Sequence, residues 1–253
     1  MFSVNNLTVG YGEKIVVKNA SFKMEKGEFC VLLGLNGSGK TTLLKAACGL
    51  IKPASGHLML DGVDCTNLNE RKRARYISYI AQRHSELRGV SVLDTVLMGF
   101  NPQLRLLMHP NIVQKALAKD TLEKMGLKDI IEEDFSHLSE GQKQLVLLCR
   151  ILVQDTPVLF MDEPDSALDF LNKHKMLAKI RNVIQTEGKM GLMTLHDPNL
   201  ALAYCDKMIL LHEGEIIKRL RIKEASGMDI QNCLSAIYGD IEIIEHNGRF
   251  IMI

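Results

Sequence analysis

Short runs in which apolar and polar residues alternate are separated along the chain by segments with helical spacing. Residues 2–9 and 14–24 alternate as strands do and are joined by the turn Gly10-Tyr11-Gly12-Glu13. The runs 29–33 and 157–161 are apolar throughout, which is typical of strands that a parallel sheet buries on both faces. Strands that alternate with helices in this way predict an α/β fold.

The middle of the chain has the most extended helical pattern. Residues 91–131 repeat apolar positions at helical spacing, and Pro102 and Pro110 break this stretch with a loop. A further helix is expected to begin at Ser139, because Ser139 and Gln142 have the spacing of a capping box. These segments predict a helical insert within the alternating chain.

In the second half of the chain, predicted helices and strands alternate again, and a predicted hairpin follows them. Residues 169–187 and 198–205 are predicted helices, and residues 190–195 and 208–211 are predicted strands. Two short strand-like runs flank Asn247-Gly248, a dipeptide that favours the tight turn of a β-hairpin.

Length and charge narrow the class of protein. A chain of 253 residues with 46% hydrophobic residues suits one large α/β domain or a core with a small insert. The 31 basic and 30 acidic residues nearly balance, whereas nucleic-acid-binding proteins usually carry a basic excess. A basic cluster on a predicted helix at residues 68–75 is interpreted as a solvated helix face. No nucleic-acid partner is therefore expected.

The cysteines and the lengths of the apolar runs indicate in which part of the cell the protein is expected to work. The six cysteines are scattered without a C-x-x-C pair, and several lie in apolar runs, which favours buried free thiols in a reducing cytosol. No run reaches the roughly 18–20 apolar residues that span a bilayer, and the amino-terminal residues lack the pattern of an export signal. Work at a membrane is therefore expected to depend on a partner.

The clearest chemical motif follows the apolar run 29–33. The stretch Gly34-Leu35-Asn36-Gly37-Ser38-Gly39-Lys40-Thr41-Thr42 reads G-x-x-x-x-G-K-[ST], the phosphate-binding loop of nucleotide triphosphatases. Its glycines let N–H groups turn toward phosphate oxygens at a helix N-terminus. Lys40 would reach the outer phosphates, and Thr41 would offer its hydroxyl to Mg²⁺. A simple Gly-rich turn would not explain Lys and Thr at this offset, so the sequence predicts binding of a nucleoside triphosphate.

Polar residues also stand at the ends of three other predicted strands. Asp162 and Glu163 follow one strand, Gln82 a second and His196 a third. Ligands bind at the carboxyl ends of strands in parallel sheets, so Asp162 and Glu163 are expected where a ligand binds. Alone, His196 would be an ordinary strand-end histidine. Tyr11 lies between two glycines, which leaves its ring accessible for stacking on adenine.

Six motifs occur together in one order: the phosphate loop, Gln82, Leu138-Ser139-Glu140-Gly141-Gln142, Asp162-Glu163-Pro164, Ser166-Ala167-Leu168-Asp169 and His196. In this order and spacing the chain resembles the ATPase subunit of an ATP-binding cassette (ABC) transporter over roughly residues 2–220. The resemblance implies a RecA-like P-loop NTPase core with an antiparallel β subdomain and a helical signature subdomain. Residues 1–221 would form this nucleotide-binding domain, with the helical subdomain at about 91–150, and residues 222–253 would form a C-terminal extension with a short helix and a hairpin.

The resemblance also assigns roles to residues. Asp162 would hold Mg²⁺ through water, with Thr41 and Gln82 as the other protein contacts of the metal. Glu163 would orient the attacking water as a base, and His196 would hydrogen-bond the γ-phosphate. The residues implied in ATP binding are Tyr11, Gly34, Asn36, Gly37, Ser38, Gly39, Lys40, Thr41, Thr42, Ser139, Gly141 and Asp169.

Ser139 and Gly141 resemble the family signature that, in a head-to-tail dimer, closes over ATP held by the other subunit. Exposed N–H groups and the dipole at the start of that helix favour phosphate. One chain carries one phosphate loop and one signature, so two composite sites imply two cassettes. Three residues depart from the family pattern, namely Glu140 for glycine, Leu35 for proline and Asp165 for threonine.

The orientation of Glu140 follows from two opposing effects. Its carboxylate gains about 0.3–1 kcal/mol from the helix dipole. At ~8 Å from a phosphate charge it would lose about 2 kcal/mol per unit charge at an effective dielectric near 20. The repulsion is larger, so we expect the side chain to point away from the nucleotide.

Residues 68–82 and 91–99 are similar to segments of importers for ferric siderophores, haem or cobalamin. The expected function is ATP binding and hydrolysis that powers such an importer, in peripheral association with the cytoplasmic face of the cell membrane. Expected partners are a second copy, separate integral-membrane permease subunits and, through these, an extracytoplasmic binding protein. The main alternative is a soluble ABC ATPase in cofactor or iron–sulfur assembly; an exporter half and a nucleic-acid-associated ATPase fit less well. The cargo does not touch this chain and cannot be read from it.

Overall fold

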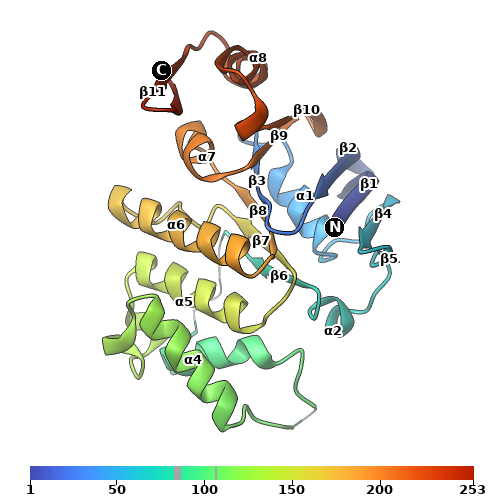
Figure 1. The fold of residues 1–253 in the computed structure, drawn as a ribbon. Helices are drawn as coiled ribbons and strands as arrows, with labels where there is room; N and C mark the ends of the chain where they lie inside the picture. The colour runs from blue at the N-terminus through green and yellow to red at the C-terminus, as the bar shows by residue number, and fades with distance from the viewer. Residues whose placement is uncertain (83–86, 106) are drawn as a thin grey trace.

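The computed structural model describes residues 1–82, 87–105 and 107–253. Figure 1 shows a central sheet with a smaller sheet on its right, a helical region below and the C-terminal residues above. The central sheet has the strand order β10-β9-β3-β8-β7-β6. Its members are β3 (Phe29–Leu33), β6 (Ile77–Ile80), β7 (Val158–Asp162), β8 (Met190–Thr194), β9 (Lys207–His212) and β10 (Glu215–Arg221). All are parallel except β10, which pairs antiparallel with β9.

The smaller sheet is antiparallel and has the order β2-β1-β4-β5. Its strands are β1 (Phe2–Tyr11), β2 (Lys14–Met24), β4 (Ser55–Leu60) and β5 (Val63–Asp64). A third sheet is the predicted C-terminal hairpin, formed by β11 (Ile243–His246) and β12 (Arg249–Met252). Its turn residues Asn247 and Gly248 both have positive φ, 51° and 70°, as a tight hairpin turn requires.

The helices lie where helical spacing predicts them, but the long stretch at residues 91–131 is divided into several shorter helices. They are α1 (Lys40–Ala47), α2 (Glu70–Arg73), α3 (Val92–Leu97), α4 (Ile112–Lys124), α5 (Glu140–Val153), α6 (Phe170–Thr186), α7 (Pro198–Tyr204) and α8 (Gly227–Tyr238), with 3₁₀ turns η1 (Met98–Phe100), η2 (Lys128–Ile130), η3 (Phe135–His137) and η4 (Ile222–Glu224). The helix expected from residue 68 begins at residue 70, because the Asn69 side chain caps it by accepting from the Lys72 N–H.

The capping box predicted at the start of α5 is present. The Gln142 N–H donates to Ser139 Oγ at 3.3 Å, and the Ser139 N–H donates to Gln142 Oε1 at 2.9 Å. These two bonds fix the start of the helix at Glu140, with Ser139 as its N-cap residue.

Strand β3 lies between two hydrophobic cores. Phe29, Val31 and Leu33 face one core, which they share with α3 to α8, whereas Cys30 and Leu32 face the other, shared with α1 and the antiparallel sheet. All five side chains are fully buried, which explains why this run is apolar without alternation. The strand that carries the phosphate loop is therefore held rigidly on both faces.

The C-terminal residues pack on the same core as the central sheet. Ile230, Cys233 and Leu234 of α8 belong to that core. The hairpin is bonded to α7, since Asn199 donates to Met252 O at 3.1 Å and accepts from the Met252 N–H at 2.8 Å. The division into a domain at 1–221 and an extension at 222–253 stays a prediction.

Two expectations from composition can be compared with the structure. All six cysteines are buried free thiols, and burial raises the pKa of Cys149 to about 12. Among the helices that the structure describes, none has the length and hydrophobicity needed to cross a bilayer.

Candidate functional site: a nucleotide site at the edge of the central sheet

The phosphate loop connects β3 to α1 and depends on glycine at specific positions. A Cβ atom at Gly34 would lie 2.3 Å from the carbonyl oxygen of Leu211 and 2.6 Å from Ser38 Oγ. Gly37 and Gly39 have φ values of 80° and 103°, which side chains rarely adopt. Gly39 precedes α1 and no side chain caps that helix. The first N–H groups of α1 therefore face the loop without a side-chain acceptor, as an anion site requires.

Lys40 and Ser38 place polar atoms inside this loop. Lys40 Nζ donates to the carbonyl oxygens of Gly34 at 2.8 Å and Leu35 at 3.1 Å. Burial lowers the pKa of Lys40, and the carboxylates of Glu163 and Asp162 partly oppose that shift. The buried Ser38 hydroxyl has no hydrogen-bond partner within the described chain. A buried hydroxyl usually has a partner, and phosphate oxygens held in the loop would supply one.

Asp162 ends β7 and is fully buried. Its two oxygens accept from the Thr194 hydroxyl at 2.9 Å and from the Tyr79 hydroxyl at 3.3 Å. Burial, with a contribution from Asp162, raises the pKa of Tyr79, so the phenol keeps its proton and acts as donor. The two hydroxyls hold the carboxylate in one orientation at the strand end.

Glu163 follows Asp162 and has a left-handed backbone, with φ of 48°. Its N–H donates to Thr194 Oγ1 at 2.7 Å. Its carboxylate accepts from Gln82 Nε2 and lies 2.8 Å from His196 Nε2. Polar residues from the ends of three strands are thus brought together around Glu163. Gln82 and His196 contact its carboxylate, and Thr194 joins its backbone to Asp162.

Two residues of this cluster were not anticipated from the sequence. Thr194 joins Asp162 to the Glu163 backbone, and Tyr79 supports Asp162 from β6. Thr194 lies opposite Asp162 in the pairing of β7 with β8. The available signal was a polar residue at the end of an otherwise apolar strand, two residues before His196. Its partner could not be identified without the strand order.

The signature residues lie apart from the phosphate loop within one chain. Ser139, Gly141 and Asn172 line a pocket of about 320 Å³ to which no residue of the loop contributes. Asp169 caps α6, accepting from the N–H and the side-chain amide of Asn172 at 2.9 and 2.8 Å. Tyr11, at the end of β1, has an exposed ring. The chain thus brings together the loop, Asp162 and Glu163, but not the signature.

Glu140 points in a different direction from its two neighbours in the signature. Its carboxylate is 2.7 Å from Lys143 Nζ. It lines a hollow formed with Phe135 and His137, which shares no lining residue with the pocket of Ser139 and Gly141. This geometry agrees with the expected outward orientation.

Comparison with known proteins shows what the chain is similar to. The family model described as ABC transporter matches residues 17–166. An iron chelatin transport ATP-binding protein of Helicobacter pylori is 34% identical over 254 residues, covering 100% of this chain and 98% of the relative. The hemin import ATP-binding protein of Shewanella denitrificans is 33% identical over 224 residues, covering 87% of each. A solved metal-chelate type ABC transporter in an inward-facing conformation matches with a TM-score of 0.82 at 26% identity, covering 100% of this chain and 95% of that one.

Proposed function

The chain belongs to the ABC transporter family as an ATP-binding, ATP-hydrolysing subunit, and from that premise we propose that it powers the import of an iron chelate, either a siderophore complex or haem. The observation that carries the ATPase activity is the contact between Glu163, Gln82 and His196 beside the phosphate loop. The cargo class is supported by relatives named for iron chelatin and hemin transport. Neither is named for cobalamin or for cofactor assembly, so those readings are not favoured.

In this proposal the phosphate loop binds ATP through its backbone and Lys40. The N–H groups of Gly37, Gly39 and the first turn of α1 surround the phosphates, and the Ser38 hydroxyl donates to one of their oxygens. Lys40 exchanges its two carbonyl acceptors, at 2.8 and 3.1 Å, for the outer phosphates. Tyr11 offers its exposed ring to adenine.

Mg²⁺ is the metal that the residues beside the loop would suit. Thr41, Gln82 and Asp162 offer a hydroxyl, an amide and a carboxylate oxygen, which are the hard oxygen ligands that Mg²⁺ prefers. Bound there with ATP, the metal would neutralise charge on the phosphates. Asp162 fits this role because Tyr79 and Thr194 already fix its orientation.

Glu163 is proposed as the base that accepts a hydrogen bond from the attacking water. Its left-handed backbone, with φ of 48°, costs about 1–3 kcal/mol for a residue other than glycine. The bond from its N–H to Thr194 stabilises this conformation. Gln82 and His196 bond the two carboxylate oxygens and so set the direction in which the carboxylate accepts.

A second copy of the chain is proposed to complete each ATP site. Ser139, Gly141 and Asp169 line or flank a pocket remote from the phosphate loop of their own chain. In a head-to-tail pair, the N-terminus of α5 would approach the phosphates bound by the other copy, where its dipole favours negative charge. Integral-membrane permease subunits, an extracytoplasmic binding protein and peripheral association with the cytoplasmic face of the membrane complete the proposal.

Uptake of labelled cargo tests the proposal as a whole. Cells of the source organism that lack this chain should lose uptake of a radiolabelled ferric siderophore or of haem. The wild-type chain should restore it and Lys40→Ala should not. Lys45→Ala is the matched control, because Lys45 lies on the same helix α1 and has no hydrogen bond to the loop within the described residues. Undiminished uptake of both iron chelates in cells without the chain would refute the cargo assignment.

A further inference from the structure

Helix α7 begins directly after His196 and lies against the C-terminal segment, residues 227–253, which contains α8 and the hairpin. Figure 1 shows α7 between α6 and this hairpin. Asp197 caps α7, and its carboxylate accepts from the Asn199 N–H at 2.8 Å. Burial raises the pKa of Tyr238 in α8, and the Asp197 carboxylate adds to this rise, so α8 lies close to the same helix start. The position of this start is therefore tied to the C-terminal segment.

The Asn199 side chain pairs with the backbone of β12 as a neighbouring strand would. Its Nδ2 donates to the Met252 carbonyl oxygen at 3.1 Å, and its Oδ1 accepts from the Met252 N–H at 2.8 Å. An asparagine side chain carries a donor and an acceptor, so this one residue satisfies both backbone groups of Met252. A leucine at this position would make neither bond, and an aspartate would keep the acceptor alone.

The hairpin gives Asn199 a fixed partner because it is anchored independently of α7. The Ile243 N–H of β11 donates to Gln231 Oε1 of α8 at 3.1 Å. Phe250 and Met252 of β12 pack against the hydrophobic core that α8 shares with the central sheet. The strand to which Asn199 is bonded is thus held by α8 and by the core.

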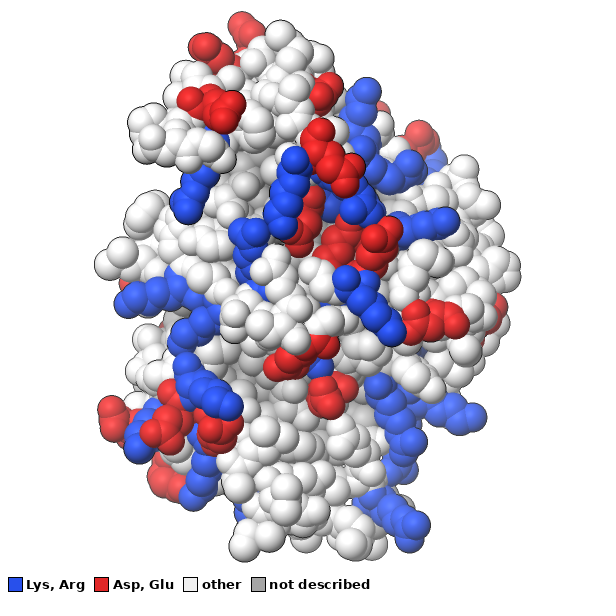
Figure 2. All heavy atoms as spheres, viewed as in Figure 1, with Lys and Arg blue, Asp and Glu red and all other residues white. Residues whose placement is uncertain are grey.

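The contact between α7 and the C-terminal segment is made by neutral groups. Helix α7 has no charged residue. Figure 2 shows a largely uncharged surface with some acidic side chains at the top of the molecule, where Figure 1 places α8 and the hairpin. Salt screens interactions between exposed charges, so raised salt should not loosen this contact.

The direction of the His196 side chain depends on the backbone on either side of it. The side chain is 47% exposed, and its Nε2 lies 2.8 Å from Glu163 Oε1. Leu195, on the strand side, is fully buried. On the other side, two residues separate His196 from Asn199, so a shift of the first turn of α7 would move the His196 backbone.

We propose that Asn199 is a positioning residue for ATP hydrolysis, which pairs with Met252 to fix the start of α7 and so holds His196 against Glu163. This inference rests on the proposed function, in which Glu163 accepts a hydrogen bond from the attacking water. Without the pair, the first turn of α7 shifts relative to the sheet, and His196 no longer bonds the Glu163 carboxylate. The C-terminal segment thus acts on the reaction through α7.

Steady-state ATP hydrolysis by the full chain tests this role with Asn199→Leu, which removes both bonds to Met252. The kcat should fall at least about tenfold, because a misplacement of ~1 Å caused far from the reacting atoms can lower a rate ~100-fold. The KM for ATP should stay at the wild-type value, since the phosphate loop is untouched. Asn199→Asp keeps the acceptor for the Met252 N–H, so its kcat should lie between, and it replaces Asn199→Leu if that variant does not fold.

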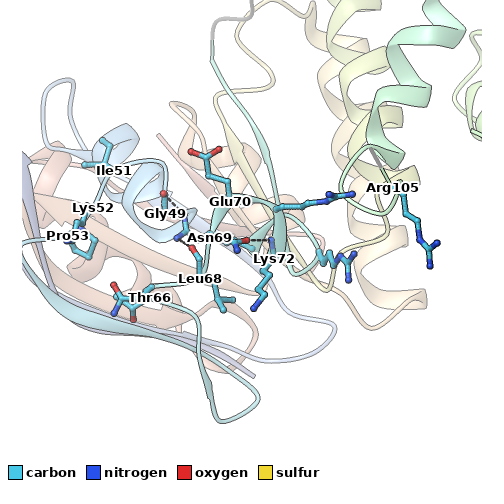
Figure 3. Close-up of a pocket in the computed structure, with 14 residues that line it drawn as sticks. Gly49, Ile51, Lys52, Pro53, Thr66, Leu68, Asn69, Glu70, Lys72 and Arg105 are labelled. Carbon is cyan, nitrogen blue, oxygen red and sulfur yellow. Dashed lines mark hydrogen bonds between the residues drawn. The ribbon is translucent and has the colours of Figure 1, made fainter. Parts of the chain in front are cut away.

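Two control variants remove comparable bonds at other places. Gln231→Leu removes the bond between α8 and the hairpin. Asn69→Leu removes the cap of α2, where the Asn69 side chain accepts from the Lys72 N–H beside a hollow that no residue of α7 lines (Figure 3). Both controls should lower the free energy of unfolding in urea, as Asn199→Leu does, while kcat stays at the wild-type value. A purely structural role for Asn199 predicts the same effect on kcat in all three variants.

The ring of His196 gives a readout that does not depend on turnover. Its ¹H–¹³C NMR signal is assigned by its loss in His196→Gln. The signal should shift in Asn199→Leu, because the ring moves relative to the Glu163 carboxylate, and should stay in place in both controls. In the His196→Gln background, Asn199→Leu should lower kcat no further.

Three results would overturn the proposal: a wild-type kcat for Asn199→Leu, an equal loss of kcat in Gln231→Leu, or an unshifted His196 signal. Glu163→Gln is measured alongside, so that a failure of this inference is distinguished from a failure of the proposed function. Phosphate release by Glu163→Gln at the wild-type rate would refute the function itself. An inactive Glu163→Gln together with a fully active Asn199→Leu would refute the positioning role alone.

Discussion

At the scale of single residues, the site combines one strained backbone with several buried polar groups. Glu163 has φ of 48°, and its N–H and the Asp162 carboxylate are both bonded to Thr194. Lys40 is buried, and burial lowers its pKa against the opposing effect of Glu163 and Asp162. These groups are costly to bury singly. Their mutual contacts offset part of that cost and fix their positions.

Lys40→Ala should abolish measurable ATP binding without unfolding the protein. The substitution removes the ammonium that would reach the outer phosphates and two bonds within the loop, at 2.8 and 3.1 Å. Calorimetry with a non-hydrolysable ATP analogue measures the affinity, and urea unfolding measures the stability. Lys45→Ala, on the same helix, should bind as the wild type does. Equal affinity of Lys40→Ala and wild type would mean that the loop is only a turn.

Asp165→Asn should stabilise the protein at neutral pH. Burial raises the pKa of Asp165 above its ordinary value of 3.8, although Lys173 at 3.4 Å opposes this, and one carboxylate oxygen has no partner within the described residues. The folded state therefore binds the proton more tightly than the unfolded state. The free energy of unfolding falls as pH rises from 3.8 through the raised pKa and is lowest above it.

Urea unfolding at several pH values measures this effect. At pH 7 the variant should gain about 1 kcal/mol, and the gain should shrink as pH falls toward the ordinary pKa of 3.8. Asp240→Asn is the control, because Asp240 is exposed. A gain of the same size for both variants, or one that does not depend on pH, would contradict the assignment.

At the scale of elements, caps decide where the helices begin. Ser139 starts α5 through a reciprocal capping box, and Ser226 starts α8 in the same way with Asp229. The first box was predicted from the spacing of Ser139 and Gln142. The second was not, although Ser226 and Asp229 have the same separation, because the third helical residue there is Asp and not the Glu or Gln of the usual pattern.

Ser139→Ala should lower ATP turnover more than its effect on stability explains. Loss of the cap costs about 1 kcal/mol of folding free energy, and the proposed contact of the hydroxyl with phosphate is lost as well. Ser226→Ala removes an equivalent capping box from α8 and should cost similar stability with unchanged turnover. Turnover is compared at temperatures equally far below the melting temperature of each variant. Equal turnover by the two variants would then contradict a phosphate-facing role for Ser139.

Glu140→Gly should change turnover by only a few-fold, less than ~1.4 kcal/mol of barrier. The Glu140 carboxylate pairs with Lys143 at 2.7 Å and lines a hollow separate from that of Ser139 and Gly141. The rate is measured at saturating ATP with the membrane partner present, because we expect the closed dimer to be scarce without that partner. A gain of tenfold or more would show that the carboxylate opposes ATP binding in the dimer.

At the scale of the whole molecule, the order of strands creates the site. The phosphate loop and Gln82 follow β3 and β6, and Asp162 and Thr194 end β7 and β8. These four strands are neighbours in the sheet although their positions in the sequence are far apart. Periodicity predicted each of these strands, and the sequence singled out the phosphate loop, Asp162 and Gln82 at their ends, but not Thr194. The pairing of Thr194 with Asp162 and of Tyr79 with Asp162 depends on strand order and register, which local patterns do not specify. The β1–β2 and β11–β12 hairpins were predictable because their turns are local, whereas the pairing of β1 with β4 joins distant parts of the chain.

Phosphate release from ATP by Glu163→Gln is the most direct test of the central claim that this strand edge hydrolyses ATP. The amide keeps the shape of the side chain and its place beside Gln82 and His196, but it cannot act as a base. Release should fall at least ~100-fold while ATP affinity is retained, and the protein should accumulate at twice its mass of 28.4 kDa. Glu215→Gln, at an exposed residue of β10, should release phosphate at the wild-type rate. Release by Glu163→Gln within a few-fold of the wild type would contradict the account.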